Sequence, residues 1–126
     1  MLAVDTNVLV RVLARDDARQ AAAADQAVAK GAWVSHLVLA EAVWVLDADY
    51  ARTAKQLIAA LALLLVHETL VLQDADVVAG ALAHFRSRPA LGFSNCLVLE
   101  IARKAGHLPL ATFDKALARL AGAQKL

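Results

Sequence analysis

The sequence of 126 residues is poor in cysteine, in aromatic residues and in excess charge of either sign. Its one cysteine, Cys96, excludes an internal disulfide, and without a second thiol it argues against a zinc–thiolate site and for a small core residue. Thirteen Lys and Arg residues balance twelve Asp and Glu residues, so the charge lacks the basic excess of an obvious nucleic-acid binder and any acidic tail. Aromatic residues make up 5% of the chain, whereas alanine makes up about a quarter, a mixture that favours closely packed helices.

The sequence also lacks a long hydrophobic run. Residues 57–66, the most apolar stretch, span about ten residues between Lys55 and Glu68, well short of the ~20 needed to cross a bilayer. No positively charged region precedes an apolar stretch in residues 1–10, which already contain Asp5 and Asn7. We therefore expect no cleavable signal peptide, no membrane association and a cytoplasmic location. The length predicts one domain over residues 1–126.

Short apolar runs alternate with stretches of helical pattern along the chain. Strands are predicted at residues 2–4, 33–34, 69–72 and 108–112. Helices are predicted from residue 8, over 17–30, from 36, over 51–66, 74–85 and 94–105, and from about 114. Ser35, Asp74 and Ser94 are the expected N-caps of three of these helices, and Trp33 and Trp44 are assigned to the core. The alternation predicts an α/β fold with a parallel sheet covered on both faces.

Acidic residues follow several of these predicted strands. Asp5 ends the first strand, Glu41 lies on the second turn of the helix after strand 33–34, and Asp114 lies two residues beyond the strand ending at Thr112. Polar residues beyond the carboxyl ends of parallel strands converge on one crevice. Asn95, in the first turn of the helix after Gly92, joins them if that turn faces the same crevice.

Carboxylates crowded in one pocket repel each other unless a cation compensates their charge. Oxygen ligands with no His or Cys partner at ligand spacing suit Mg²⁺ or Mn²⁺ better than Zn²⁺. Such an ion holds a phosphate oxygen and lowers the pKa of an attacking water, so the expected chemistry is phosphodiester hydrolysis.

Four segments in order, AVDTNVLVR, SHLVLAEAVWVL, GFSNCLVLEIARKAG and LPLATFDK, closely resemble a PIN domain of the VapC-type toxin ribonucleases of bacterial toxin–antitoxin pairs. The resemblance spans nearly the whole chain and implies a three-layer α/β/α fold with a short-stranded, mostly parallel sheet. It implies catalytic roles for four residues and supporting roles around them. The catalytic set is Asp5, Glu41, Asn95 and Asp114, with Asp5, Asn95 and Asp114 as metal ligands and Thr6, Asn7 and Thr112 in support. The family further implies Mg²⁺-dependent cleavage of single-stranded or looped RNA, a homodimer, and inhibition by a VapB-type antitoxin.

Asn95 departs from the family pattern, which normally places its third acid at this position. A carboxamide offers a metal one neutral oxygen but removes a full negative charge, which lowers the expected metal affinity and turnover. Natural divergence and a deliberate inactivating change are both compatible with one sequence. A second hypothesis is therefore a catalytically impaired PIN-like module that binds RNA or an antitoxin. A phosphatase with a nucleophilic Asp after the first strand ranks third, because Asn7 stands where that class needs a second Asp.

Local positive charge is expected where a nearly neutral protein grips RNA. The candidates for phosphate contacts are Arg11 and Arg15 on the first helix and Arg86 and Arg88 beside the loop before Asn95, with a solvated surface role as the alternative. The apolar helix around residues 58–66, with that of residues 37–46, is predicted to form a two-fold interface.

Overall fold

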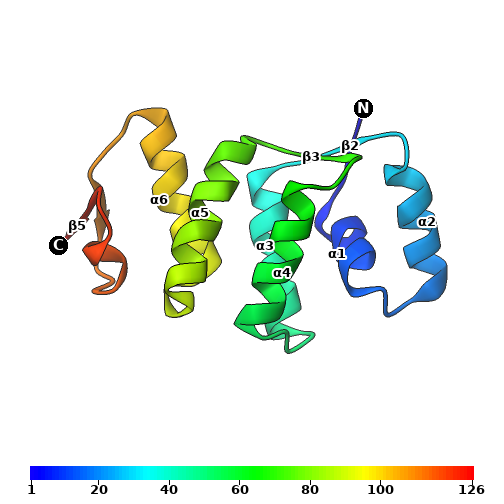
Figure 1. The fold of residues 1–126 in the computed structure, drawn as a ribbon, viewed down its shortest axis with the longest axis horizontal. Coiled ribbons are helices and arrows are strands. Elements are labelled where there is room, and N and C mark those ends of the chain that lie inside the picture. Colours follow the sequence, from blue (N-terminus) through cyan, green and yellow to red (C-terminus); the bar gives the residue numbers. More distant parts are fainter. The chain divides into compact units, whose positions relative to one another are not determined.

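The computed structural model describes all 126 residues and divides into two compact units, residues 1–75 and residues 76–126 (Figure 1). The first unit contains β1 (Leu2–Ala3), α1 (Thr6–Ala14), α2 (Ala18–Val28), β2 (Ala32–Val34), α3 (His36–Ala48), α4 (Ala54–Leu65) and β3 (Leu70–Leu72). The second contains α5 (Ala75–Ser87), which begins at the boundary, then the 3-10 turn η1 (Pro89–Leu91), α6 (Phe93–Ala105), β4 (Leu110–Thr112), the 3-10 turn η2 (Leu117–Arg119) and β5 (Ala123–Lys125). No helix is both long and apolar enough to cross a membrane.

The first unit is built on a parallel sheet in the order β1-β2-β3. The connections from β1 to β2 and from β2 to β3 run in the same direction across the sheet. Because such connections are right-handed, their helices lie on the same face of the sheet. Figure 1 shows α1 to α4 on that face. Ala32 and Val34 of β2 are buried, whereas Trp33 between them is 38% exposed. The expected α/β fold with short parallel strands is confirmed.

All four helices of this unit begin at a side-chain N-cap. Asp5, Asp17, Ser35 and Thr53 each accept a hydrogen bond from the backbone N–H three residues ahead. Because a cap satisfies a donor that the first turn leaves unpaired, each is worth about 1 kcal/mol of stability. Thr53 also exchanges hydrogen bonds with Gln56 as a capping box, so α4 begins at Ala54 rather than at residue 51.

The second unit differs from its predicted pattern at one helix start and at its end. Ser94 lies inside α6, which starts after Gly92 without a side-chain cap, whereas Asp74 directly precedes α5, where the sequence placed it, with a φ of 43°. The predicted helix from residue 114 is wrong, because a short 3-10 turn there leads into β5, which pairs in parallel with β4. The packing of α5 on α6 includes an edge-to-face contact of Phe85 with Phe93, with ring centroids 6.1 Å apart.

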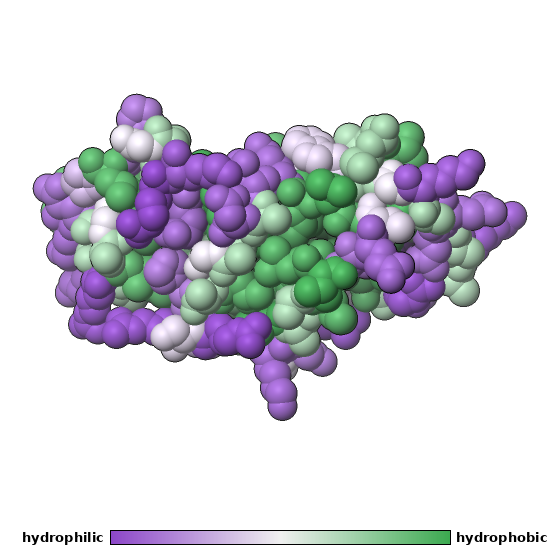
Figure 2. Space-filling view, turned by 45° about the horizontal axis from the view of Figure 1, so that its top comes forward, coloured by the Kyte–Doolittle hydropathy of each residue, from purple (hydrophilic) through white to green (hydrophobic).

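Two sequence assignments of aromatic residues to the core are also wrong. Trp44 is 67% exposed, because α3 buries Leu39, Ala42 and Leu46 instead of the Trp44 side, and Trp33 is 38% exposed, because the side chains of β2 alternate between the two faces of the sheet. Apolar side chains are concentrated in part of the face drawn in Figure 2 rather than scattered evenly over it. The exposed large apolar residues of α3 and the α4 end include Leu37, Trp44, Leu63 and Val66.

Candidate functional site

Asp5 stands two residues beyond β1, at the start of α1, where the sequence placed it. Its Oδ1 accepts a hydrogen bond of 3.0 Å from the backbone N–H of Val8 and so caps the helix. Its second oxygen, Oδ2, has no hydrogen-bond partner, and the residue is exposed. Capping and ligand binding are therefore compatible, since each uses a different oxygen.

Glu41 lies on α3 and is joined to the residue after Asp5. The hydroxyl of Thr6 donates a hydrogen bond of 2.8 Å to Glu41 Oε2, which leaves Oε1 without a partner. The sequence argument placed Glu41 near an apolar face where an unpaired carboxylate is costly, but this face is exposed, so that cost does not arise. Glu41 is exposed, and so are its helical neighbours Leu37 and Trp44. The side chain of Asn7, the second residue of α1, is exposed and makes no hydrogen bond.

Asn95 and Asp114 belong to the second unit. The Nδ2 group of Asn95 donates to the backbone oxygen of Leu91 at 3.0 Å, one helical turn earlier, and Oδ1 has no partner. Asp114 accepts a 2.9 Å hydrogen bond from the N–H of Leu117 on Oδ1, while its own N–H donates to the hydroxyl of Thr112. Thr112 thus fixes the turn in which Asp114 lies.

The four candidate site residues share one property that suits a hard divalent cation. In each, one side-chain oxygen has no hydrogen-bond partner within the protein and is free to bind. Oxygen-only donors of this kind fit Mg²⁺ or Mn²⁺. Two of the donors lie in each unit, and no three His, Cys, Asp or Glu side chains are grouped closely enough to hold a metal ion. Convergence of all four on one ion stays a prediction.

Two of the four candidate arginines are already engaged. Arg15 forms a two-point hydrogen bond with Asp25, at 2.7 and 2.9 Å, which raises the pKa of Arg15 and lowers that of Asp25. Arg11 bonds Tyr50 at 2.8 Å and Asp16 at 3.1 Å. Arg86 and Arg88 are exposed and have no side-chain partner, so they retain their full donor capacity for phosphates.

The remaining cysteine and histidine residues offer no second chemical centre. Cys96 is fully buried, and that burial raises the pKa of its thiol to about 11. His67 Nδ1 accepts from the N–H groups of Thr69 and Leu70 and so secures the start of β3. The sequence missed His36, whose Nε2 is buried without a hydrogen bond and lies 3.9 Å from Asp74 Oδ2.

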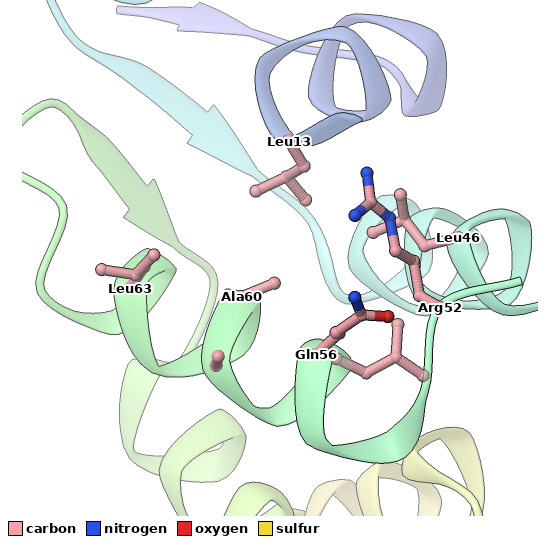
Figure 3. A pocket seen from close by; sticks show the side chains of 8 residues that line it. Leu13, Leu46, Arg52, Gln56, Ala60 and Leu63 are labelled. Carbon is pink, nitrogen blue, oxygen red and sulfur yellow. The ribbon is translucent and has the colours of Figure 1, made fainter. Parts of the chain in front are cut away.

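A pocket of about 270 Å³ lies between α1, α3 and α4, and none of the four candidate site residues lines it (Figure 3). Its walls include Leu13, Leu46, Ala60 and Leu63, with Arg52 and Gln56 as the polar groups. No acidic or other nucleophilic side chain lines it, so it offers no hydrolytic chemistry.

Polar side chains beyond the carboxyl ends of short parallel strands are typical of the ligand-binding edge of an α/β protein. Comparison with protein families gives a match to the PIN domain over residues 2–123. The chain therefore belongs to the PIN domain family, whose members are generally metal-dependent nucleases. No curated protein matches the chain. The match supports a nuclease-type activity that uses a divalent metal ion, whereas the single-domain prediction over residues 1–126 stays a prediction.

Proposed function

We propose that the protein is a Mg²⁺-dependent endoribonuclease toxin of the VapC type, with Mn²⁺ as an alternative ion. The observation that supports it is the free oxygen on each of four residues, Asp5, Glu41, Asn95 and Asp114, in a chain of the PIN family. Asp5 and Asp114 provide the negative charge that attracts the ion, and Asn95 adds a neutral oxygen. When bound, such an ion polarises the scissile phosphate and lowers the pKa of an attacking water.

Within this proposal the protein groups have separate tasks. Thr6 holds one oxygen of Glu41, so the carboxylate keeps a fixed orientation while its other oxygen can accept the proton of the attacking water. The hydrogen bond from Val8 N–H to Oδ1 holds the Asp5 side chain in place, so that Oδ2 would be the oxygen that binds the metal ion. Arg86 and Arg88 are the candidates for RNA phosphate contacts, because Arg11 and Arg15 are held by acidic partners.

We also propose a homodimer and a VapB-type antitoxin as partners. The free carboxylate oxygens of Asp5 and Glu41 suit an antitoxin arginine, because a guanidinium fork matches carboxylates in two-point geometry. Such a contact would occupy the acids in place of a metal and block substrate. Reversing the charge of Asp5 or Glu41 would then weaken antitoxin binding.

A catalytically impaired PIN-like module that binds RNA or the antitoxin is the second candidate. One observation favours it: Asn95 uses its amide N–H to bond Leu91 O, which an aspartate cannot do. The amide of Asn95 therefore makes a hydrogen bond at this position that favours asparagine over aspartate in the folded protein. An inactive wild-type protein that still binds RNA or antitoxin would support this candidate.

The decisive experiment compares cleavage of end-labelled structured RNAs in Mg²⁺, in Mn²⁺ and in EDTA. Asp5→Asn removes the carboxylate but retains an equally good helix cap, so it separates metal binding from folding. We expect it to lower cleavage by about 100-fold, at the upper end of the effects seen when groups supporting a metal are removed. Asp17→Asn is the matched control, since Asp17 caps α2 with the same geometry and should leave cleavage unchanged. Cleavage in EDTA, or full activity of Asp5→Asn, would contradict the proposal.

A further inference from the structure

A groove of about 340 Å³ opens beside Asp5, between α1 and α2, and lies entirely within the first unit. Asp5, Asn7, Val8 and Arg11 line it from the α1 side, and Gln20 and three alanines, Ala23, Ala24 and Ala27, line it from α2. Its volume falls in the lower range of sites for small organic groups. The groove therefore adjoins the acid at which the proposed function places the phosphate.

The hydrogen-bonding character of the groove is set by Gln20. Arg11 Nε donates to Gln20 Oε1, so the carbonyl oxygen of this amide is already used. The NH₂ group of Gln20 has no partner and offers two donors. Gln20 thus presents donors rather than acceptors to an occupant.

Arg11, in turn, is fixed by groups outside the groove. Its guanidinium bonds Asp16 and the hydroxyl of Tyr50, and that hydroxyl donates to Asp16 at 2.8 Å. The charge of Arg11 is therefore balanced by Asp16, and its role toward Gln20 is to set the orientation of the amide.

These features fit a base better than a phosphate. The Asp5 carboxylate in the wall repels an anion, and the charge on Arg11 is already paired. The methyl groups of Ala23 and Ala27 provide an apolar wall that needs no polar partner. Single-stranded RNA presents unstacked bases that are bound by packing on their faces and hydrogen bonds on their edges.

We propose that the groove holds one unstacked RNA base next to the phosphate at Asp5, and that Gln20 selects a base with a carbonyl oxygen rather than an amino group at the edge position that its NH₂ group meets, which is C4 of a pyrimidine. This proposal deepens the nuclease proposal and rests on it for the position of the phosphate. Uracil and cytosine provide a matched comparison, because both carry the O2 carbonyl oxygen, whereas at C4 uracil carries a carbonyl oxygen and cytosine carries an amino group. The groove is therefore expected to favour uracil over cytosine.

The test measures binding separately from cleavage. Fluorescein-labelled oligo(U) and oligo(C) of equal length are titrated in EDTA and followed by fluorescence anisotropy. We expect the wild-type protein to bind oligo(U) about threefold or more tightly than oligo(C), as one net hydrogen bond provides. Gln20→Glu retains an acceptor for Arg11 but replaces the free NH₂ with a second acceptor, so the preference should reverse toward oligo(C). Gln26→Glu adds the same charge to an exposed position of α2 outside the groove and should leave the ratio unchanged.

Filling the groove provides an independent test. Ala23→Leu should weaken binding of both oligonucleotides, whereas Ala22→Leu, at an exposed neighbouring position that does not line the groove, should not. Thermal melting of each variant confirms that it is folded. If Gln20→Glu and Ala23→Leu leave RNA binding unchanged, the base site is wrong, and a protein side chain becomes the candidate occupant.

The two proposals fail in different ways. Metal-dependent cleavage with unaltered binding in both groove variants would overturn the base site alone. The expected reversal in EDTA without cleavage in Mg²⁺ or Mn²⁺ would retain the base site and overturn the nuclease.

Discussion

The hydroxyl of Thr6 donates a 2.8 Å hydrogen bond to Oε2 of Glu41, across 35 positions of sequence. It joins the first turn of α1 to α3 directly beside Asp5. Since Glu41 is exposed, this bond adds little to the free energy of unfolding. Its effect is to restrict how the Glu41 carboxylate is oriented.

Replacing Thr6 with valine, which keeps the shape but removes the hydroxyl, tests this positioning role. We expect Thr6→Val to lower RNA cleavage by about tenfold, as for other groups that orient a metal-site carboxylate. The free energy of unfolding should change by less than about 1 kcal/mol. Thr6→Ser, which restores the hydroxyl, should recover cleavage. Equal cleavage by Thr6→Val and wild type would show that Glu41 needs no such support.

Gly80 on α5 lies against the Glu100 carboxylate on α6. A Cβ at position 80 would lie 2.9 Å from Glu100 Oε1, and Glu100 also bonds Arg103 at 3.0 Å and lies 3.4 Å from His84 Nε2. Alanine in a helix is worth about 1 kcal/mol more than glycine, but here it must displace this carboxylate. We therefore expect Gly80→Ala to be neutral or destabilising in the wild type and stabilising by about 1 kcal/mol in a Glu100→Ala background. Urea unfolding of the four proteins of this cycle measures the difference, and identical effects in both backgrounds would contradict the contact.

The Tyr50 hydroxyl sets the acidity of Asp16. Its hydrogen bond is the largest cause of the lowered pKa of Asp16, with Arg11 adding to it. Because the pKa in the folded state lies below its unfolded value, this interaction stabilises the fold above the unfolded pKa and loses that effect as pH falls through the folded pKa. Tyr50→Phe should raise the pKa of Asp16, and its free energy of unfolding should therefore decrease less than that of wild type as the pH is lowered. Carboxyl NMR titration measures the shift, with Asp25, which Arg15 holds, as the unchanged control.

Local signals in the sequence predicted most of the first unit, because a cap or strand end depends on neighbouring residues. Asp17 and Ser35 lie where the sequence placed the starts of their helices, whereas α1 begins at Thr6, two residues before its predicted start. Pairing between residues distant in the sequence could not be predicted from local patterns. The strand Ala123–Lys125 is an example, because it forms by pairing with β4. The same limit hid Gln20, whose significance depends on Arg11 nine positions away. The sequence likewise named four candidate catalytic residues, three of them by their places after strands and Asn95 by its place after the Gly92 loop, while their convergence depends on tertiary placement.

The exposed apolar residues of α3 and of the end of α4 are the expected contact surface of the proposed homodimer. Leu63 is 66% exposed and Val66 is 77% exposed, and burying them in a two-fold contact would recover about 25 cal/mol for each Å² removed from water. We expect light scattering at high micromolar concentration to give a dimer that Leu63→Asp converts to a monomer. Val98→Asp, at an exposed apolar position of α6, is the matched control and should remain dimeric. A wild-type monomer would refute the dimer.

Asn95→Asp has opposite effects in the metal-free and metal-bound protein. Without metal, the variant loses the 3.0 Å bond from Nδ2 to Leu91 O and sets an acceptor beside that carbonyl, at a cost of about 1 kcal/mol. With metal, the added charge strengthens the attraction for the cation, if Asn95 lies in the proposed site.

Paired melting curves with and without Mn²⁺ separate these effects. We expect the Tm of Asn95→Asp to lie a few degrees below wild type in EDTA, about 4 °C for a chain of this size, and to rise more than wild type when Mn²⁺ is added. Cleavage of structured RNA should increase in parallel. Asn95→Ala is the control, because it loses the same bond to Leu91 without gaining a carboxylate, so its Tm should fall in EDTA and respond least to Mn²⁺. Equal Mn²⁺ shifts in all three proteins, with no gain in cleavage, would place residue 95 outside the metal site.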